Sequence, residues 1–130
     1  MEPIIKTVEL HNHVKLPYVE QGSFSGFPLV LLHGYADSWH SFERVLPYLP
    51  ESIRVFALTQ RGHGDASRPT TGYQLRDFTT DLVAFMESLP PCRTNVPLFS
   101  VATGCIRIAG KNVSLYGTSY LLISSSLAAL

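Results

Sequence analysis

Two stretches of sequence decide the fold: residues 29–35, LVLLHGY, and residues 54–67, RVFALTQRGHGDAS. Each begins as a short apolar run and ends in a glycine-bearing turn, which is typical of a buried strand that stops at a loop. Between them, residues 41–49 place apolar side chains at helical spacing. Strand, helix and strand in this order indicate two parallel strands joined by a right-handed crossover. Both glycine turns are therefore expected at one edge of the sheet, where parallel sheets bind ligands.

The segments on either side extend this unit. Residues 6–10 and 14–20 predict two short strands that form an antiparallel hairpin. Residues 74–89 predict an amphipathic helix, because apolar residues recur at steps of three and four and two prolines then stop it. Asp77 and Asp81 are expected on the polar face of this helix.

Beyond Pro91 the sequence changes in character, because charged residues become sparse and Ser, Thr and Gly more frequent. We expect one or two strands within residues 96–108, a strand at residues 113–116 and the start of a helix within residues 120–130. The 130 residues suit a single domain with one core.

Composition excludes several classes of function. The formal net charge is zero, which gives no electrostatic reason to expect a nucleic acid or membrane partner. Cys92 and Cys105 have neither metal-ligand nor redox spacing, so we expect no cofactor and no metal. The start of the chain lacks a signal-peptide pattern and no apolar run is long enough to span a bilayer, so a cytoplasmic protein is expected.

The paired turns resemble those of the α/β-hydrolase family, AB hydrolase-1 type. The resemblance covers residues 14–89 and is specific, because two turns occur in the family's order. It implies an α/β fold of three layers with a mostly parallel sheet, incomplete in this chain. We expect a single partial domain over residues 1–130, with residues 1–89 family-like and residues 90–130 divergent, truncated or disrupted after about Leu89.

The first turn resembles the family's oxyanion-hole turn. The resemblance implies that the backbone N–H of Tyr35 is one donor to the oxyanion and that of Tyr120 the other. His33 is expected to support the turn rather than act as a base, and Gly34 to supply the backbone freedom that the turn needs. Trp39 is expected to pack the loop over the pocket.

The second turn resembles the arginine-glycine-x-glycine turn that follows the family's fourth strand. The resemblance implies that Arg61, Gly62, His63 and Gly64 shape the pocket floor. The family pattern usually has an acid two residues before the arginine, and Thr59 stands there.

The nucleophile implied by the resemblance is Ser119, in Gly117-Thr118-Ser119-Tyr120-Leu121. The family pattern is Gly-x-Ser-x-Gly, and Leu121 replaces its last glycine. The alternative is a serine in an unrelated tail. The family's acid and histidine follow the serine, but none of the eleven residues after Ser119 is Asp, Glu or His.

The histidines His11 and His13 could pair on a metal, but no carboxylate clusters with them in sequence, and solvated surface histidines are the simpler interpretation.

Three hypotheses for function remain open: a serine-type hydrolase of esters or amides that is expected to be inactive as this chain, a non-catalytic fragment, and a small-molecule binding module. The expected partner is a small-molecule substrate. We also expect self-association through an exposed sheet edge, near residues 113–116.

Overall fold

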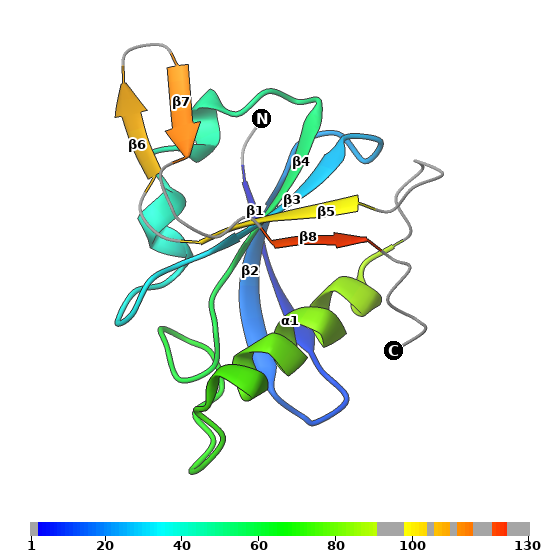
Figure 1. The fold of residues 1–130 in the computed structure, drawn as a ribbon, viewed down its shortest axis with the longest axis vertical. Coiled ribbons are helices and arrows are strands. Elements are labelled where there is room, and N and C mark those ends of the chain that lie inside the picture. The colour runs from blue at the N-terminus through cyan, green and yellow to red at the C-terminus, as the bar shows by residue number, and fades with distance from the viewer. Residues whose placement is uncertain (1–2, 91–97, 104–105, 110–111, 116–120, 125–130) are drawn as a thin grey trace.

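The computed structural model describes residues 3–90, 98–103, 106–109, 112–115 and 121–124. Within these ranges a twisted six-stranded sheet forms the centre of the molecule, with the strand order β1-β2-β4-β3-β5-β8 (Figure 1). Its strands are β1 (Ile4–Glu9), β2 (Lys15–Gln21), β3 (Phe27–Leu32), β4 (Ile53–Leu58), β5 (Leu98–Thr103) and β8 (Leu121–Ser124).

The pairing within the sheet is mixed. β1 and β2 form the predicted antiparallel hairpin, and β3 and β4 are parallel, as predicted, with Leu29 opposite Val55 and Leu32 opposite Leu58. β5 is also parallel to β3, but β2 is antiparallel to β4 and β8 to β5. The sheet is therefore mixed and not mostly parallel as predicted, because β2 and β8 run against their neighbours and three of the five pairings are antiparallel.

Two apolar clusters cover the two faces of the sheet. On one face, α1 (Leu75–Ser88) packs against β2, β3 and β4 through Leu82, Phe85 and Met86. On the other face, the loop between β3 and β4 packs through Trp39, Phe42 and Leu46. Strands that are buried on both faces read as continuous apolar runs, which is why β3 and β4 were recognisable in the sequence.

The segment between β3 and β4 is not the single helix that its apolar spacing predicted. It forms two 3₁₀-helices, η1 (Trp39–Phe42) and η2 (Leu46–Tyr48). Pro47 lies inside the second one, and a proline there lacks the N–H that a longer helix would need. The apolar side chains still reach the core, so the spacing identified the buried face correctly but not the type of helix.

The part of the chain after Pro91 differs from the sequence predictions in two places. β7 (Asn112–Leu115) pairs with β6 (Ile106–Ala109) in a separate two-stranded sheet, so the strand expected near residues 113–116 does not belong to the main sheet (Figure 1). Only two residues separate β6 from β7 in sequence, which favours local hairpin pairing. The segment predicted to begin a helix contains β8, because a short apolar run does not distinguish strand from helix by periodicity.

The described helices give no indication of a membrane span: not one of them combines the length and the apolar character that a bilayer crossing requires.

Candidate active site

The two glycine turns lie side by side at the carboxyl ends of β3 and β4, as the parallel pairing requires. His33, the first residue after β3, is buried between them. Its Nε2 accepts the backbone N–H of Gln60 at 2.9 Å, and the Gln60 side-chain amide donates to the His33 carbonyl oxygen at 3.0 Å. The ring centroids of His33 and His63 are 4.8 Å apart in an edge-to-face arrangement. The two turns are therefore joined by direct contacts.

These hydrogen bonds fix the tautomer of His33. Because Nε2 accepts from an amide, the proton of the neutral ring is on Nδ1, which donates to the Gly34 carbonyl oxygen at 2.8 Å. Burial lowers the pKa of His33 below its ordinary value of 6.5, although the Gly34 carbonyl partly opposes this. Both ring nitrogens are thus engaged in holding the turns.

The backbone of the first turn differs from expectation in one detail. A left-handed conformation occurs at Ala36, with φ of 57°, and not at Gly34. A side chain at position 34 would meet open space. The Tyr35 side chain is 98% exposed, and its backbone N–H has no acceptor among the described residues. Within the described ranges, the turn therefore presents an N–H donor without an acceptor three residues after the end of β3.

The second turn does require its glycines. Gly62 and Gly64 have φ of 76° and 46°, in the region that favours glycine. A Cβ on Gly62 would lie 2.6 Å from Cε1 of Tyr73. Thr59, which stands where the family has an acid, is buried and accepts the Trp39 backbone N–H at 3.1 Å through its hydroxyl.

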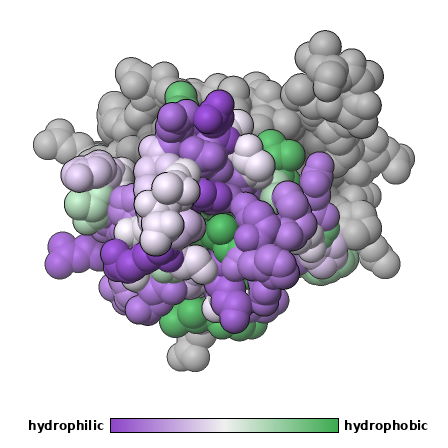
Figure 2. Space-filling view, turned by 90° about the horizontal axis from the view of Figure 1, so that it is seen from below, coloured by the Kyte–Doolittle hydropathy of each residue, from purple (hydrophilic) through white to green (hydrophobic). Residues whose placement is uncertain are grey.

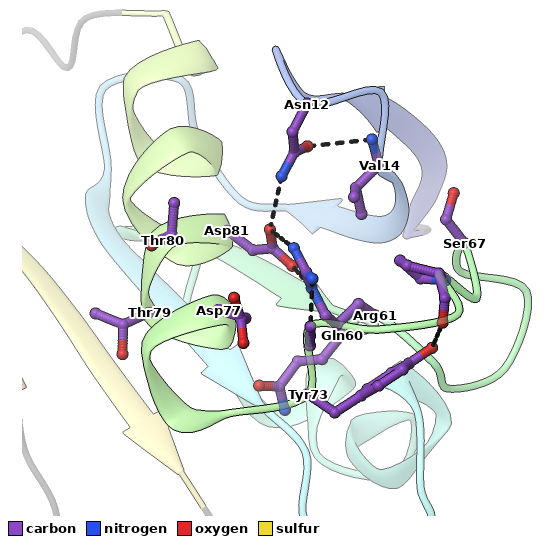
Figure 3. A network of polar contacts seen from close by, with 12 residues as sticks. Asn12, Val14, Gln60, Arg61, Ser67, Tyr73, Asp77, Thr79, Thr80 and Asp81 are labelled. Carbon is purple, nitrogen blue, oxygen red and sulfur yellow. Dashed lines mark hydrogen bonds and ion pairs between the residues drawn. The ribbon is translucent and has the colours of Figure 1, made fainter.

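A buried ion pair anchors the second turn to α1. Nε and Nη2 of Arg61 each donate to a carboxylate oxygen of Asp81 at 2.6 Å, and Nη1 donates to the Gly72 carbonyl at 2.8 Å (Figure 3). The hydrogen bonds with Asp81 raise the pKa of Arg61. Asn12, from the β1–β2 turn, also reaches Asp81, at 3.4 Å. The prediction that Asp81 lies on the polar face of the helix is wrong, because a charged partner on a neighbouring loop draws it inward.

The ion pair shows what Arg61 can do chemically. Its guanidinium is buried and three of its groups are already bonded, so it has a structural part in holding the turn. Asp77, expected beside Asp81, has a local part: its carboxylate accepts the backbone N–H of Gln74 at 2.9 Å and caps the helix start.

A cleft of about 650 Å³ opens between the two turns. Asp37 and Arg68 place opposite charges in its lining, and Tyr73 and Phe78 contribute aromatic residues to it. Viewed from below, this end of the molecule is mostly hydrophilic, with small separate hydrophobic areas (Figure 2). The cleft is lined by Tyr35, Ala36, Asp37, Gly62, His63, Gly64, Arg68, Tyr73 and Phe78.

The structure brings together most of the residues singled out in the sequence. Tyr35, Gly62, His63 and Gly64 line the cleft. Trp39 is instead buried in the core beneath η1, and its ring stacks on that of His40 with centroids 3.9 Å apart. Ser119 and Tyr120 lie outside the described residues.

Among the residues that the structure describes, no three His, Cys, Asp or Glu side chains are grouped as a metal site would need. His13 lies instead 3.3 Å from the carboxylate of Glu9 on the surface.

Four residues of the site were missed by sequence reasoning: Asp81, Arg68, Tyr73 and Phe78. The sequence contained an indication of Asp81, because Arg61 follows a buried strand and a buried arginine needs a carboxylate partner. The other three belong to the loop after β4 and to the start of α1, and a sequence alone does not show how that loop folds back.

Comparison with known proteins agrees with this geometry. Residues 28–107 match the family model of the alpha/beta hydrolase fold. The chain is 44% identical over 71 residues to a soluble epoxide hydrolase from Corynebacterium sp. (strain C12), a match that covers 55% of this chain and 24% of that protein. It is 34% identical over 109 residues to a putative non-heme chloroperoxidase from Synechocystis sp., covering 81% of this chain and 39% of that protein.

A solved structure gives the same result. The crystal structure of an epoxide hydrolase from Vigna radiata has a TM-score of 0.66 and 29% sequence identity, and the match covers 80% of this chain and 32% of that one.

The fold thus defines an α/β protein with a cleft at the carboxyl ends of two parallel strands. The chain belongs to the α/β-hydrolase fold family. It spans between 24% and 39% of the length of the two curated relatives described above.

Proposed function

We propose that this chain carries the oxyanion-hole half of a hydrolase active site that acts on ester or amide bonds. One observation carries the proposal: Tyr35 follows β3 and lines the cleft, and its backbone N–H has no acceptor among the described residues. A donor that is fixed in advance stabilises the negative charge that develops on a carbonyl oxygen without reorganising in the transition state.

The contacts of His33 support this role for the turn. Its ring bonds Gln60 on one side and Gly34 on the other, so it holds the donor-bearing loop against the neighbouring strand end. An oxyanion donor is useful only if its position is rigid, and a buried neutral ring bonded at both nitrogens supplies that rigidity.

The second donor and the nucleophile of the proposed site are the Tyr120 backbone N–H and the Ser119 hydroxyl, by family resemblance. In the family the serine attacks the carbonyl carbon while a histidine accepts its proton. No Asp, Glu or His follows Ser119 in this chain. We therefore expect the chain alone to bind a small molecule in the cleft without turning it over.

The test is turnover of p-nitrophenyl acetate by the purified chain and by Ser119→Ala. We expect both to hydrolyse the ester at the same low rate, because the base that activates the serine is missing. Robust turnover that is lost in Ser119→Ala would contradict the expected inactivity and make Ser119 the nucleophile.

A second candidate is hydrolysis of an epoxide. Two of the relatives compared above are named epoxide hydrolases, one of them 44% identical over the matched residues. Diol formation from styrene oxide by the purified chain would favour this candidate over the ester and amide class. Binding of small molecules without any product would favour the binding module.

A further inference from the structure

We propose that Arg68 makes the cleft a binding site for a small molecule that carries one carboxylate on an aromatic or apolar body. This inference rests on the proposed function, because it names the ligand class of the same cleft. It is carried by the way in which the Arg68 guanidinium is held.

Arg68 is anchored without being neutralised. Its Nη1 donates to the Gly62 carbonyl at 3.1 Å and its Nη2 to the Gly64 carbonyl at 2.9 Å. Both acceptors belong to the second glycine turn, so the guanidinium is fixed to the wall of the cleft. Backbone carbonyls are uncharged, and the full positive charge of the side chain therefore remains available to a ligand.

Arg68 differs in this from the two buried arginines. Arg54 pairs with Glu20 at 2.6 Å, and Arg61 pairs with Asp81 at 2.6 Å. Within the described residues no carboxylate lies within ion-pair distance of Arg68. A guanidinium has five N–H donors, and the two carbonyls leave donors free for the fork geometry that matches a carboxylate.

The other residues that line the cleft indicate what the remainder of the ligand should be. Tyr73 and Phe78 offer aromatic surfaces, with ring centroids 6.5 Å apart, that suit an apolar or aromatic body. Asp37, from the loop after β3, adds a negative charge. The nearby Ser41 hydroxyl and the Ser38 N–H keep the pKa of Asp37 below its usual value, so this group stays ionised near neutral pH. It repels an anion, and a ligand with one carboxylate is thereby oriented toward Arg68.

The experiment uses the whole chain and two probes of the same shape, benzoate and benzamide, titrated while amide signals are followed by NMR. We expect benzoate to bind about tenfold more tightly than benzamide, because only benzoate pairs with the guanidinium. The shifted amides should be those of residues 35–37 and 62–64. Isophthalate, which carries a second carboxylate, should bind more weakly than benzoate.

Variants assign the effect to one side chain. Arg68→Gln should reduce benzoate affinity about tenfold, to that of benzamide, and leave benzamide affinity unchanged. Arg44→Gln, an exposed arginine outside the cleft, is the matched control and should change neither. Arg68→Lys keeps the charge without the planar fork and should give an intermediate benzoate affinity, which covers the case in which the glutamine variant does not fold.

Equal affinity for the two probes, shifts confined to other residues, or benzoate binding that survives Arg68→Gln would each overturn the inference. Such a result would leave the proposed function standing, because p-nitrophenyl acetate is neutral and neither its test nor the donor at Tyr35 involves Arg68. Conversely, stronger binding of benzoate than of benzamide would support the ligand class even if robust ester turnover contradicted the expected inactivity of the chain.

Discussion

Gln60 and His33 bond each other twice: the Gln60 backbone N–H donates to the His33 ring at 2.9 Å, and the Gln60 side chain donates to the His33 carbonyl at 3.0 Å. The two residues follow neighbouring parallel strands, so this pair closes the sheet edge where the cleft lies. Tyr35 lies two residues after His33, and Arg68 is bonded to the turn that follows Gln60. The position of the whole site therefore depends on this contact.

Stability should fall on mild acidification because of His33. Burial lowers its pKa in the folded chain below 6.5, so the unfolded chain takes up the proton first as the pH falls. The contribution of the neutral His33 ring to the free energy of unfolding is complete above about pH 7. It is lost progressively as the pH falls below the pKa of this histidine in the unfolded chain. Urea unfolding at about pH 7.5 and about pH 5.5 measures the loss.

His33→Gln is the control for this titration. We expect it to lower stability at neutral pH and to flatten the pH dependence between these two values. Glu20 and Asp37 lose their contributions only at lower pH, since their pKa values lie below the ordinary 4.5 and 3.8. A slope that is equal in His33→Gln and in the unaltered chain would contradict the assignment.

Breaking the buried ion pair should be costly. Asp81→Asn leaves the Arg61 guanidinium buried without a countercharge, and we expect a loss of about 3–5 kcal/mol in the free energy of unfolding. Glu87→Gln, on the exposed side of the same helix, should change it by less than about 0.5 kcal/mol. Urea denaturation compares them, and similar losses in both variants would show that the pair does not anchor the turn.

The two turns should respond differently to a methyl group. Gly62→Ala forces a left-handed residue and brings a Cβ to within 2.6 Å of the Tyr73 ring, so we expect a loss of about 1–3 kcal/mol. Gly34→Ala meets no atom within 4 Å and should be tolerated. Thermal unfolding of the two variants compares their stability. A larger loss of stability in Gly34→Ala than in Gly62→Ala would contradict the backbone conformations described for the two turns.

Self-association through a sheet edge remains an expectation, and β1 is an edge strand of the six-stranded sheet, whereas the strand near residues 113–116 lies outside that sheet. Ile4 and Ile5 of β1 are 59% and 63% exposed. The backbone groups on the outer side of β1 are available for antiparallel pairing with β1 of a second copy, which favours a dimer. Sedimentation velocity should show association that Ile5→Lys abolishes and that Tyr48→Lys, at an exposed position on η2, leaves unchanged. A monomer at all concentrations would contradict it.

The sequence predicted the fold best where a strand is buried on both faces of the sheet. β3 and β4 are covered on both faces, so their apolar runs and terminal glycines predicted the parallel pair and the position of the cleft. The inward position of Asp81 could not be predicted from helical spacing alone, because it depends on Arg61 in a loop that is distant in sequence. The two 3₁₀-helices were missed because apolar spacing marks a buried face and Pro47 decides the type of helix.

The site was predictable only in part for the same reason. Four residues of the cleft come soon after the ends of β3 and β4, and the strand ends therefore fix their location. They are Tyr35, Gly62, His63 and Gly64. Arg68, Tyr73 and Phe78 reach the cleft because the chain after β4 folds back across it. Backbone hydrogen bonds hold this loop in its folded-back position, for example the bond from the Gly62 N–H to the Ser67 carbonyl at 2.9 Å. The spacing of apolar residues in the sequence does not predict such bonds.

The two glycine turns meet at His33 beside the cleft, and NMR of the histidine rings is the decisive measurement of this contact. We predict an Nδ1-protonated, neutral His33 at neutral pH, with nuclear Overhauser contacts from its ring to the Gln60 amide proton and to the ring of His63. A His33 ring that titrates near its ordinary pKa and shows no contact with residues 60–63 would contradict the account.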